Sequence, residues 1–345
     1  MKKRILIVQT AFIGDVILVT PLLRETRKLF PNSIIDVLVA SGNQSILKNN
    51  PHLNNILVTD KKKIGSYFTI LKSLRKKKYD VAITPHRSAR TLTILFFAGI
   101  KVRIGFNQDI YRHLLNCQLK HPKGVHKAKK NLELLSPFIN DKYPKLKLVD
   151  VHIRKEYLNW YSELFPSQND YDLSTKYLQS GRNIALAPGS VWNTKKWSKN
   201  NYSILAKLLK EQGFNVVFIG SNAERDLAQE IITKAGIEAT NSCGKLTILQ
   251  SAALISQCKA LVCNDSGALH IGNAVNTQVF AFFGPTVQKY GYYPYRSHDY
   301  VFEVELDCRP CGMHGHKQCP LGHHNCMKLI TPTTVFEVIT AKLTS

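Results

Sequence analysis

Residues 260–286 read ALVCNDSGALHIGNAVNTQVFAFFGPT. Within them, the apolar runs Ala260–Cys263 and Gln278–Phe282 have the length and composition of buried strands, and Ala268–Ala274 has helical spacing. A strand, a helix and a second strand in so short a stretch indicate a βαβ unit, whose two strands pair in parallel. The stretch therefore predicts an α/β fold with a parallel sheet.

The same alternation continues through most of the chain. The other strands that we expect are short, mostly β-branched runs: Ile5–Val8, Ile34–Val39, Ile56–Val58, Val81–Thr84, Val102–Ile104, Ile184–Ala187 and Val216–Ile219. The other expected helices are Asp15–Phe30, Gln44–Lys48, Ile64–Lys77, Ala89–Ala98, Asn201–Gln212, Ala223–Lys234 and Thr247–Gln257. Pro21 should kink or restart the first of these helices. This order of elements predicts two doubly wound domains.

The length of 345 residues suits two domains of about 150 to 170 residues each. The polar stretch SQNDYDLSTKYLQSG, at Ser167–Gly181, lacks periodicity and is the candidate linker. We therefore expect a first domain at residues 1–166, a linker at 167–182, a second domain at 183–331 and a C-terminal helix at 332–345. Ligands of open α/β sheets bind at the carboxyl ends of the strands, so function is expected in the loops after Val8, Ala187, Ile219 and Cys263.

The charge of the chain is strongly positive. Lys plus Arg number 47 against 24 for Asp plus Glu, which gives a formal net charge of +23 and predicts a polyanionic partner. A nucleic acid, an anionic membrane surface and a phosphorylated glycolipid all fit this charge. Hydrophobic residues make up 44% of the chain, which is typical of a folded protein.

The sequence predicts a protein without a membrane span. No run reaches the ~18 apolar residues that a spanning helix needs, and Gln9 and Asp15 interrupt the apolar N-terminal run that superficially resembles a signal peptide. Eight cysteines without an export signal predict reduced thiols in the cytoplasm.

Three loops carry side chains suited to chemistry. Asp15 follows the first strand, where a carboxylate can serve as a general base or simply cap its helix. Residues 188–197, PGSVWNTKKW, offer a hydroxyl and two ammonium groups, which suit a diphosphate or form a solvated basic loop. Asp265, Ser266 and Gly267 begin a helix whose free N–H groups can bind an anion, with His270 one turn further; alone, the motif also fits an N-cap and a core histidine.

These motifs together resemble those of a known family. They are Gly14-Asp15, Lys195-Lys196-Trp197 and Asp265-Ser266-Gly267-x-x-His270, followed by Phe283-Gly284-Pro285-Thr286. The combination resembles glycosyltransferase family 9, the ADP-heptose:lipopolysaccharide heptosyltransferases, over almost the whole chain. The resemblance implies a GT-B fold of two Rossmann-like doubly wound domains facing a central cleft. It also implies an inverting transferase that requires no metal or other cofactor for catalysis.

The resemblance implies a role for each motif. Asp15 matches the general base that takes the proton of the acceptor hydroxyl, and Lys195 matches the cation that neutralises the leaving diphosphate. The second domain binds the nucleotide sugar through Ser190, Lys196, Glu224, Asp265, Ser266, Gly267 and His270.

The resemblance gives the positive charge a partner: a phosphorylated lipid A core at the anionic inner face of the inner membrane. It implies a cytoplasmic, peripherally membrane-associated enzyme with an ADP-sugar donor and no nucleic-acid partner. Acceptor-binding residues are expected in the first domain at Gly14, Arg87, Arg90 and Arg103. The cationic runs Lys61–Lys63 and Arg75–Lys78 fit either this acceptor or the solvation of helix ends.

A cluster of cysteines near the C-terminus is not explained by these roles. Cys308, Cys311, Cys319 and Cys326 stand among four histidines with ligand types and spacing that suit a structural zinc ion. Reduced structural cysteines fit equally well and a disulfide fits less well, and none of these interpretations makes the cluster catalytic.

Two alternatives remain from the sequence. One is a member of the same family that uses another nucleotide sugar or another acceptor. The other is a basic nucleic-acid-binding protein with a zinc module, against which the chain lacks an aromatic-interleaved basic stretch.

Overall fold

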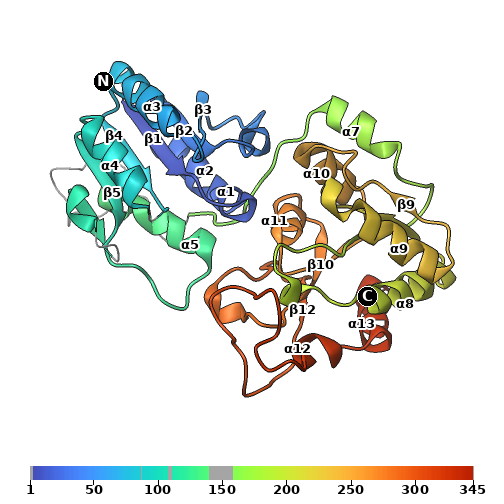
Figure 1. The fold of residues 1–345 in the computed structure, drawn as a ribbon. Helices are drawn as coiled ribbons and strands as arrows, with labels where there is room; N and C mark the ends of the chain where they lie inside the picture. The colour runs from blue at the N-terminus through green and yellow to red at the C-terminus, as the bar shows by residue number, and fades with distance from the viewer. Residues whose placement is uncertain (1–2, 87, 108–110, 140–157, 345) are drawn as a thin grey trace. The chain divides into compact units, whose positions relative to one another are not determined.

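The computed structural model describes residues 3–86, 88–107, 111–139 and 158–344. The chain divides into two compact units, unit 1 at Met1–Phe165 and unit 2 at Pro166–Ser345. In Figure 1, unit 1 runs from blue to green and unit 2 from green to red. Each unit contains one parallel sheet.

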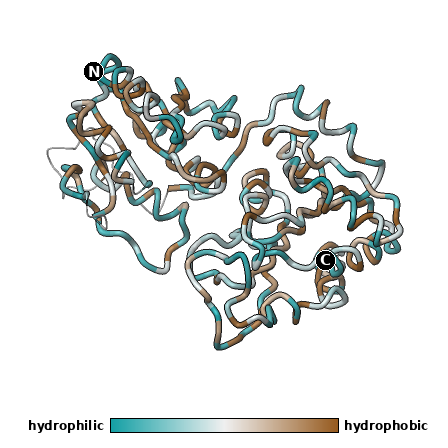
Figure 2. The backbone as a smooth tube through the Cα atoms, in the orientation of Figure 1, coloured by the Kyte–Doolittle hydropathy of each residue, from teal (hydrophilic) through white to brown (hydrophobic). Residues whose placement is uncertain are grey.

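Unit 1 is built on a six-stranded sheet in the order β3-β2-β1-β4-β5-β6. Its strands are β1 Arg4–Gln9, β2 Ile34–Ala40, β3 Asn55–Thr59, β4 Val81–Thr84, β5 Val102–Phe106 and β6 Cys117–Leu119, and all neighbours pair in parallel. The apolar side chains of Ile5–Val8 are fully buried, as expected for a central strand covered on both faces. Figure 2 shows the apolar character of these strands in brown.

The helices of unit 1 are α1 Ile13–Ile17, α2 Thr20–Leu29, α3 Ile64–Lys77, α4 Ala89–Phe97, α5 Lys127–Leu132 and α6 Ser136–Ile139, with short 3-10 turns at Gln44–Leu47, Arg112–Leu114 and Glu133–Leu135. Pro21 lies in the first turn of α2. Proline lacks an N–H group, but the first turn of a helix does not use that group, so proline fits the start of α2 and not the interior of a helix continuing from α1. The expected interruption of the first helix is confirmed.

Unit 2 repeats this strand order, as β12-β11-β10-β7-β8-β9. Its strands are β7 Asn183–Ala187, β8 Asn215–Phe218, β9 Thr240–Asn241, β10 Ala260–Asn264, β11 Gln278–Phe282 and β12 Tyr300–Phe302, again all parallel. Its helices are α7 Gln168–Thr175, α8 Lys199–Glu211, α9 Arg225–Ala235, α10 Ile248–Ser256, α11 Gly267–Ala274, α12 Asn325–Lys328 and α13 Pro332–Thr344, with 3-10 turns at Asn193–Lys195, Asn222–Glu224 and Gln288–Tyr290. None of the helices in the described ranges is long and apolar enough to span a bilayer.

Trp197 is the centre of the aromatic core of unit 2. Its ring stacks on Phe282 at a centroid distance of 4.4 Å and meets Tyr202 edge-on at 5.1 Å. Its Nε1 donates to the carbonyl of Ile330 at 2.9 Å, so the buried ring is also satisfied as a donor. The tryptophan therefore anchors the end of the 188–197 loop to the sheet.

The irregular linker expected at 167–182 contains helix α7. Ser167 and Asp170 form a capping box that begins the helix, and this local signal outweighs the absence of apolar periodicity. Two contacts join α7 to the end of α10: Thr175 Oγ1 donates to Gln257 Oε1 at 3.0 Å, and Gln257 Nε2 donates to Ser174 Oγ at 3.3 Å. The segment is thus part of unit 2.

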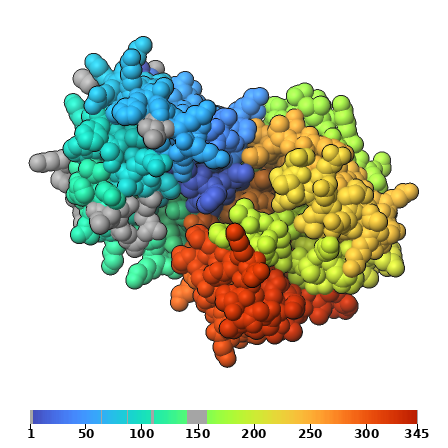
Figure 3. Space-filling model, in the orientation of Figure 1, coloured from blue at the N-terminus to red at the C-terminus, as the bar shows by residue number. Residues whose placement is uncertain are grey.

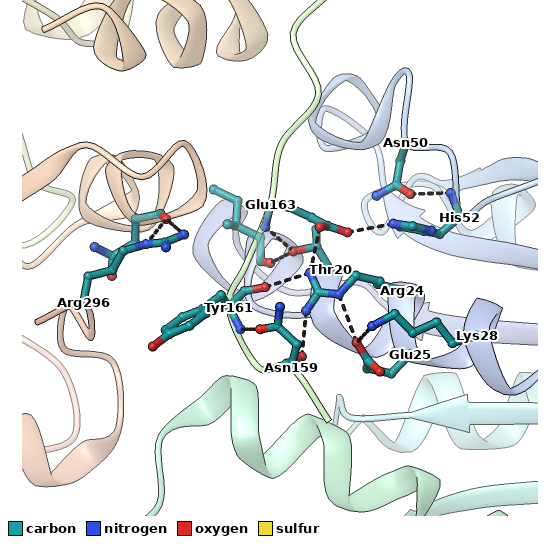
Figure 4. A network of polar contacts seen from close by, with 12 residues as sticks. Thr20, Arg24, Glu25, Lys28, Asn50, His52, Asn159, Tyr161, Glu163 and Arg296 are labelled. Carbon is teal, nitrogen blue, oxygen red and sulfur yellow. Dashed lines mark hydrogen bonds and ion pairs between the residues drawn. The ribbon is translucent and has the colours of Figure 1, made fainter. Parts of the chain in front are cut away.

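Arg24 of α2 holds the last residues of unit 1 in place. Figure 4 shows its guanidinium donating to the carbonyls of Asn159 and Tyr161 and to the carboxylate of Glu163, at 2.6, 3.0 and 2.7 Å. It also pairs with Glu25 at 3.0 Å, and both of these side chains are buried. The arginine therefore joins α2 to residues 159–163 through a buried ionic network.

Replacing Arg24 by methionine should destabilise unit 1 by about 3 kcal/mol, because two carbonyls lose the donor that Arg24 supplies and the buried Glu25 carboxylate keeps only the exposed Lys28 as its partner. Urea-induced unfolding measures the loss. Lys28→Met is the matched control, because Lys28 pairs with the same Glu25 oxygen at 3.0 Å but is 54% exposed. We expect that control to cost less than about 1 kcal/mol. Equal effects of the two changes would contradict the importance of the buried network.

Candidate active site

The loops of unit 2 leave the sheet at the same edge. β7 and β10 are adjacent and parallel, with Ala187 opposite Cys263, so residues 188–190 and 265–267 emerge side by side. The fully buried Asn264 joins them, because its Nδ2 donates to the carbonyl of Pro188 at 2.8 Å and its Oδ1 accepts from the N–H of Trp197 at 2.9 Å. The sequence analysis did not single out this positioning residue, because its role depends on contacts about 70 residues away.

Lys195, Asp265 and Thr286 meet at one oxygen atom. Lys195 Nζ lies 2.5 Å from Asp265 Oδ2, and Thr286 Oγ1 donates to the same oxygen at 2.6 Å. The side chains of Lys195 and Asp265 are only 12% and 10% exposed, so water screens their attraction weakly. The structure thus brings together two predicted site residues and adds Thr286, which ends the FGPT motif.

Helix α11 begins at Gly267, directly after Asp265 and Ser266. Ser266 occupies the N-cap position, but its side chain makes no capping hydrogen bond. The N–H groups of the first turn and the positive end of the helix dipole suit an anion beside the Lys195 ammonium. Ser190 and Lys196 are half-buried on the neighbouring loop, without a side-chain hydrogen bond to another described residue.

Glu224 reaches the same loops. Its Oε2 accepts from the N–H of Ser221 at 2.6 Å and from its hydroxyl at 2.8 Å. A Cβ atom at Gly189 would lie 1.4 Å from Glu224 Oε1, so this carboxylate occupies the space that a side chain at residue 189 would need. The structure therefore places Glu224 against the loop that follows β7.

His270 is buried in α11, and its Nδ1 has no hydrogen-bond partner among the described residues. Burial lowers the pKa of His270 to about 4; the charge of Asp265 opposes the shift and that of Lys195 adds to it. The ring is therefore neutral at pH 7. A neutral buried imidazole with an unpartnered nitrogen fits the lining of a binding site as well as a core position.

The low pKa of His270 predicts a stability that depends on pH. An unfolded histidine titrates near 6.5, so the contribution of a neutral buried ring is complete above that pH and is lost as the pH falls toward 4. Between pH 7.5 and pH 5, the free energy of unfolding should fall by about 2 kcal/mol more for the wild type than for His270→Gln. Urea titrations at both pH values measure the difference. The exposed His113→Gln should behave as the wild type, and equal slopes for wild type and His270→Gln would refute the prediction.

In unit 1, Asp15 lies in the first turn of α1, directly after β1. The N-cap position belongs to Phe12, so Asp15 is not the N-cap of its helix. Partial burial and the charge of Arg90 lower the pKa of Lys61, whereas the charge of Asp15 opposes that shift. Asp15, Lys61 and Arg90 therefore share one electrostatic environment.

A cavity of about 120 Å³ lies beside these residues, at the carboxyl edge of the unit 1 sheet. Its lining includes Lys61, Tyr67, Ser88 and Arg90. The guanidinium of Arg90 donates to Tyr67 Oη at 2.7 Å and lies 4.8 Å from the centre of its ring, which fixes the cation at the cavity wall. Gly14 precedes Asp15 in α1 at the same edge.

Of the other two predicted acceptor-binding arginines, Arg103 is not among the described residues that line this cavity. Arg103 pairs in register with Ala82, toward the amino end of the sheet, and its guanidinium donates to the carbonyls of Ile100 and Leu114. Its position does not fit the acceptor role, because the loops that bind ligands leave the opposite ends of the strands. Arg87 lies outside the described residues.

The second cationic run, Arg75–Lys78, fills the last turn and the C-cap of α3. The negative end of the helix dipole favours cations there, so a structural reason accounts for this run. Lys61–Lys63 instead precede α3 and include a cavity residue. The second run therefore has a local structural role at the end of α3, whereas the first run lies beside the cavity.

The four C-terminal cysteines lie near one another. Burial raises the pKa of Cys326 to about 11, and the charges of Cys311, Cys319 and Cys308 contribute to the rise. No group of three or more His, Cys, Asp or Glu side chains in the described ranges is arranged to hold a metal ion. The structural zinc at these thiols therefore stays a prediction.

Comparison with known proteins identifies the family. The model of glycosyltransferase family 9 (heptosyltransferase) matches residues 67–324. Lipopolysaccharide heptosyltransferase 2 of Escherichia coli (strain K12) is 26% identical, and the match covers 99% of this chain and 98% of that protein. Lipooligosaccharide heptosyltransferase 2 of Haemophilus influenzae is 29% identical, with 83% and 84% covered.

Solved structures agree with this result. The structure of E. coli ADP-heptose lipopolysaccharide heptosyltransferase II superposes with a TM-score of 0.79 at 26% identity and covers 99% of this chain and 98% of that one. A family 9 glycosyltransferase from Veillonella parvula superposes with a TM-score of 0.82 at 22% identity, covers 99% and 97% of the two chains, and supports the fold. The predicted GT-B fold is thereby confirmed. Because the family model matches well over half of the chain, the chain belongs to glycosyltransferase family 9, the heptosyltransferases.

Proposed function

We propose that the chain transfers heptose from ADP-L-glycero-β-D-manno-heptose to the inner core of lipopolysaccharide. The observation that carries this proposal is the meeting of Lys195, Asp265 and Thr286 beside the beginning of α11, in a member of a heptosyltransferase family. A cation, a hydroxyl and free helix N–H groups on one sheet edge suit the diphosphate of a nucleotide sugar. The heptose and the lipopolysaccharide acceptor come from the names of the relatives.

In the proposed reaction, Asp15 takes the proton of an acceptor hydroxyl while the oxygen forms a bond to the anomeric carbon of the heptose. The bond between that carbon and the diphosphate oxygen breaks, and its electron pair leaves with ADP. Lys195 and the first turn of α11 stabilise the charge that develops on the diphosphate. Attack on the face opposite the leaving group inverts the anomeric centre. No metal or other cofactor is needed for any of these steps.

Asp265 is proposed to hold Lys195 and Thr286 in place and also to bind the sugar. Its Oδ2 accepts from Lys195 and Thr286, and its other carboxylate oxygen is the proposed acceptor of sugar hydroxyls. Glu224 beside Gly189 is the proposed ribose contact, and His270 the neutral wall of the site. Ser190, Lys196, Ser266 and Gly267 complete the proposed donor site.

The acceptor is proposed to bind to unit 1. Lys61 and Arg90 at the cavity near Asp15 give its phosphate and carboxylate groups cationic partners. Exposed Phe68, at 70%, and Phe97, at 55%, lie on the helices α3 and α4 of the same unit. Cations and exposed aromatic rings suit a cytoplasmic enzyme that associates peripherally with the anionic inner membrane. Sedimentation with anionic vesicles tests this proposal, and no binding at low salt would reject it.

Titration calorimetry with ADP-heptose, UDP-glucose and duplex DNA tests the donor. We expect ADP-heptose to bind, and UDP-glucose and DNA to bind weakly or not at all at physiological salt. Preference for the UDP-sugar would indicate a family member with another donor. Salt-sensitive DNA binding without affinity for any nucleotide sugar would reject the transferase proposal.

A further inference from the structure

Residues 308–324 form turns and irregular chain between β12 and α12 of unit 2. This segment, which we call the cysteine-rich segment, contains three of the four C-terminal cysteines and four histidines. In the space-filling view it belongs to the red surface that borders the yellow-green residues after β7 (Figure 3). None of the proposed catalytic steps uses this segment.

The first set of contacts is with Thr194, the residue before Lys195. The N–H of Thr194 donates to the carbonyl of His316 at 3.1 Å, and the N–H of His316 donates to Thr194 Oγ1 at 2.7 Å. The ring nitrogen Nε2 of His324 lies 2.7 Å from the Thr194 carbonyl oxygen. Thr194 is only 4% exposed, so these bonds are protected from water. Both its backbone groups and its hydroxyl are thus held by the cysteine-rich segment.

Gly315 allows this close approach. A Cβ atom there would lie 2.6 Å from Trp192 Cβ, 3.0 Å from Lys195 Cγ and 3.1 Å from Thr194 Oγ1. The ring of His314 also stacks over Trp192, with an interplanar angle of 11° and a centroid distance of 6.4 Å. The segment therefore packs directly on the stem of the Lys195 side chain.

The second set of contacts is with residues 283–286. The side chain of Arg309 is 6% exposed and donates to the carbonyls of Phe283, Gly284 and Thr286 in this turn. It also donates to the carbonyl of Val304, which follows β12. The N–H of Cys311 donates to the carbonyl of Pro285 at 3.0 Å. The same segment therefore holds the backbone that carries Thr286.

Both loops deliver a side chain to the same atom. Lys195 Nζ and Thr286 Oγ1 contact Asp265 Oδ2 at 2.5 and 2.6 Å, but the two residues are 91 positions apart in the chain, and their loops follow different strands. The cysteine-rich segment contacts the backbone of both loops. One contact is to Thr194, the residue before Lys195, and the other is to the carbonyl of Thr286 itself.

We infer that the cysteine-rich segment is a brace that positions Lys195 and Thr286 on Asp265, and that Thr194 and Gly315 are positioning residues for transfer. This inference rests on the proposed function for its effect on catalysis. Its geometric part, the fixed place of Lys195, does not depend on the reaction. If the cation that neutralises the leaving diphosphate is displaced by about 1 Å, the rate of transfer can fall by about 10²-fold.

Gly315→Ala and Gly312→Ala form a matched pair within the brace. A Cβ at Gly312 would meet nothing closer than 3.5 Å, whereas one at Gly315 collides with the Lys195 loop. We expect Gly315→Ala to lower kcat by about tenfold or more, and Gly312→Ala to leave it near the wild-type value. Circular dichroism and the melting temperature establish that both variants are folded.

Thr194→Val and Thr194→Ser form a second pair, in case Gly315→Ala does not fold. Valine keeps the shape of the side chain but loses the hydroxyl that accepts from the N–H of His316, whereas serine keeps it. We expect Thr194→Val to lower kcat several-fold and Thr194→Ser to retain activity. Rescue by serine separates the hydrogen bond from the packing of the side chain.

Acetylation by acetic anhydride, quantified by peptide mass spectrometry, reports on the position of Lys195 without any substrate. Lys195 is 12% exposed and paired, so it should be modified slowly, with Lys196 as the internal reference. The Lys195 to Lys196 ratio should rise several-fold in Gly315→Ala and Thr194→Val and stay unchanged in Gly312→Ala and Thr194→Ser.

Two outcomes would overturn the brace. One is an unchanged acetylation ratio in folded Gly315→Ala or Thr194→Val, even if activity falls. The other is a variant, Gly315→Ala or Thr194→Val, whose acetylation ratio rises but whose kcat for heptose transfer equals that of an active wild type. If the wild-type protein transfers no heptose, the proposed function fails, and the acetylation ratio still decides whether the segment positions Lys195.

Discussion

Asp15→Asn is expected to lower kcat by about 10²- to 10⁴-fold, the range typical of a lost general base. The amide has nearly the same shape as the carboxylate but cannot take the proton of the acceptor hydroxyl. Asp15 lies in the first turn of α1 in unit 1, whereas the proposed donor residues lie in unit 2. We therefore expect affinity for ADP-heptose to remain within a few-fold of the wild type.

Steady-state kinetics and donor calorimetry, performed on the same preparation, test this prediction. Asp226→Asn is the control, because Asp226 lies exposed in the first turn of α9 and loses the same charge. A wild-type kcat for Asp15→Asn would remove this residue from the mechanism. A loss of donor binding equal to the loss of turnover would assign it a binding role instead.

Lys195→Ala should lower kcat by about 10²- to 10³-fold, as the loss of one preorganised group that stabilises developing charge typically does. The change removes the cation proposed to neutralise the diphosphate, and it leaves Asp265, which is 10% exposed on its side chain, with Thr286 as its remaining donor. An uncompensated carboxylate next to the departing phosphates repels them. The effect on the chemical step should therefore exceed the effect on donor affinity.

Lys199→Ala is the matched control for charge. Lys199 begins α8 only four residues later, and its ammonium is 58% exposed and paired with Glu230 on the surface. Its loss should leave kcat near the wild-type value. If both variants lose activity equally, the effect of Lys195→Ala reflects net charge and not a place beside the leaving group.

The sequence predicted the central strands and most helices because each has a local cause. Continuous β-branched runs such as Ile5–Val8 became buried strands, and Pro21 separated α1 from α2 as expected. The edge strands β6, β9 and β12 were not predicted, because two or three residues give too little periodicity to recognise. Helix α7 was missed because its signal is a capping box and not an apolar stripe.

The sequence indicated those residues of the candidate site that directly follow a strand. Lys195, Asp265 and Glu224 follow β7, β10 and β8, so topology alone indicated their common edge. Asn264 and the brace at 308–324 were not assigned these roles, because their partners lie far away in the chain, as the 122 residues between Thr194 and His316 illustrate. Arg103 lies toward the amino end of β5, a position that the sequence could not indicate, because charge alone does not show which end of a strand a side chain occupies.

Mass spectrometry of a heptose-deficient inner-core acceptor tests the proposed function most directly. The purified chain is incubated with the acceptor and ADP-heptose in the presence of a chelator, and the product is compared with that of Asp15→Asn. We predict that the wild type adds one heptosyl residue and releases one ADP for each acceptor, whereas the variant forms almost no product. An acceptor of unchanged mass after incubation with the folded wild type, or equal product from the variant, would contradict the account.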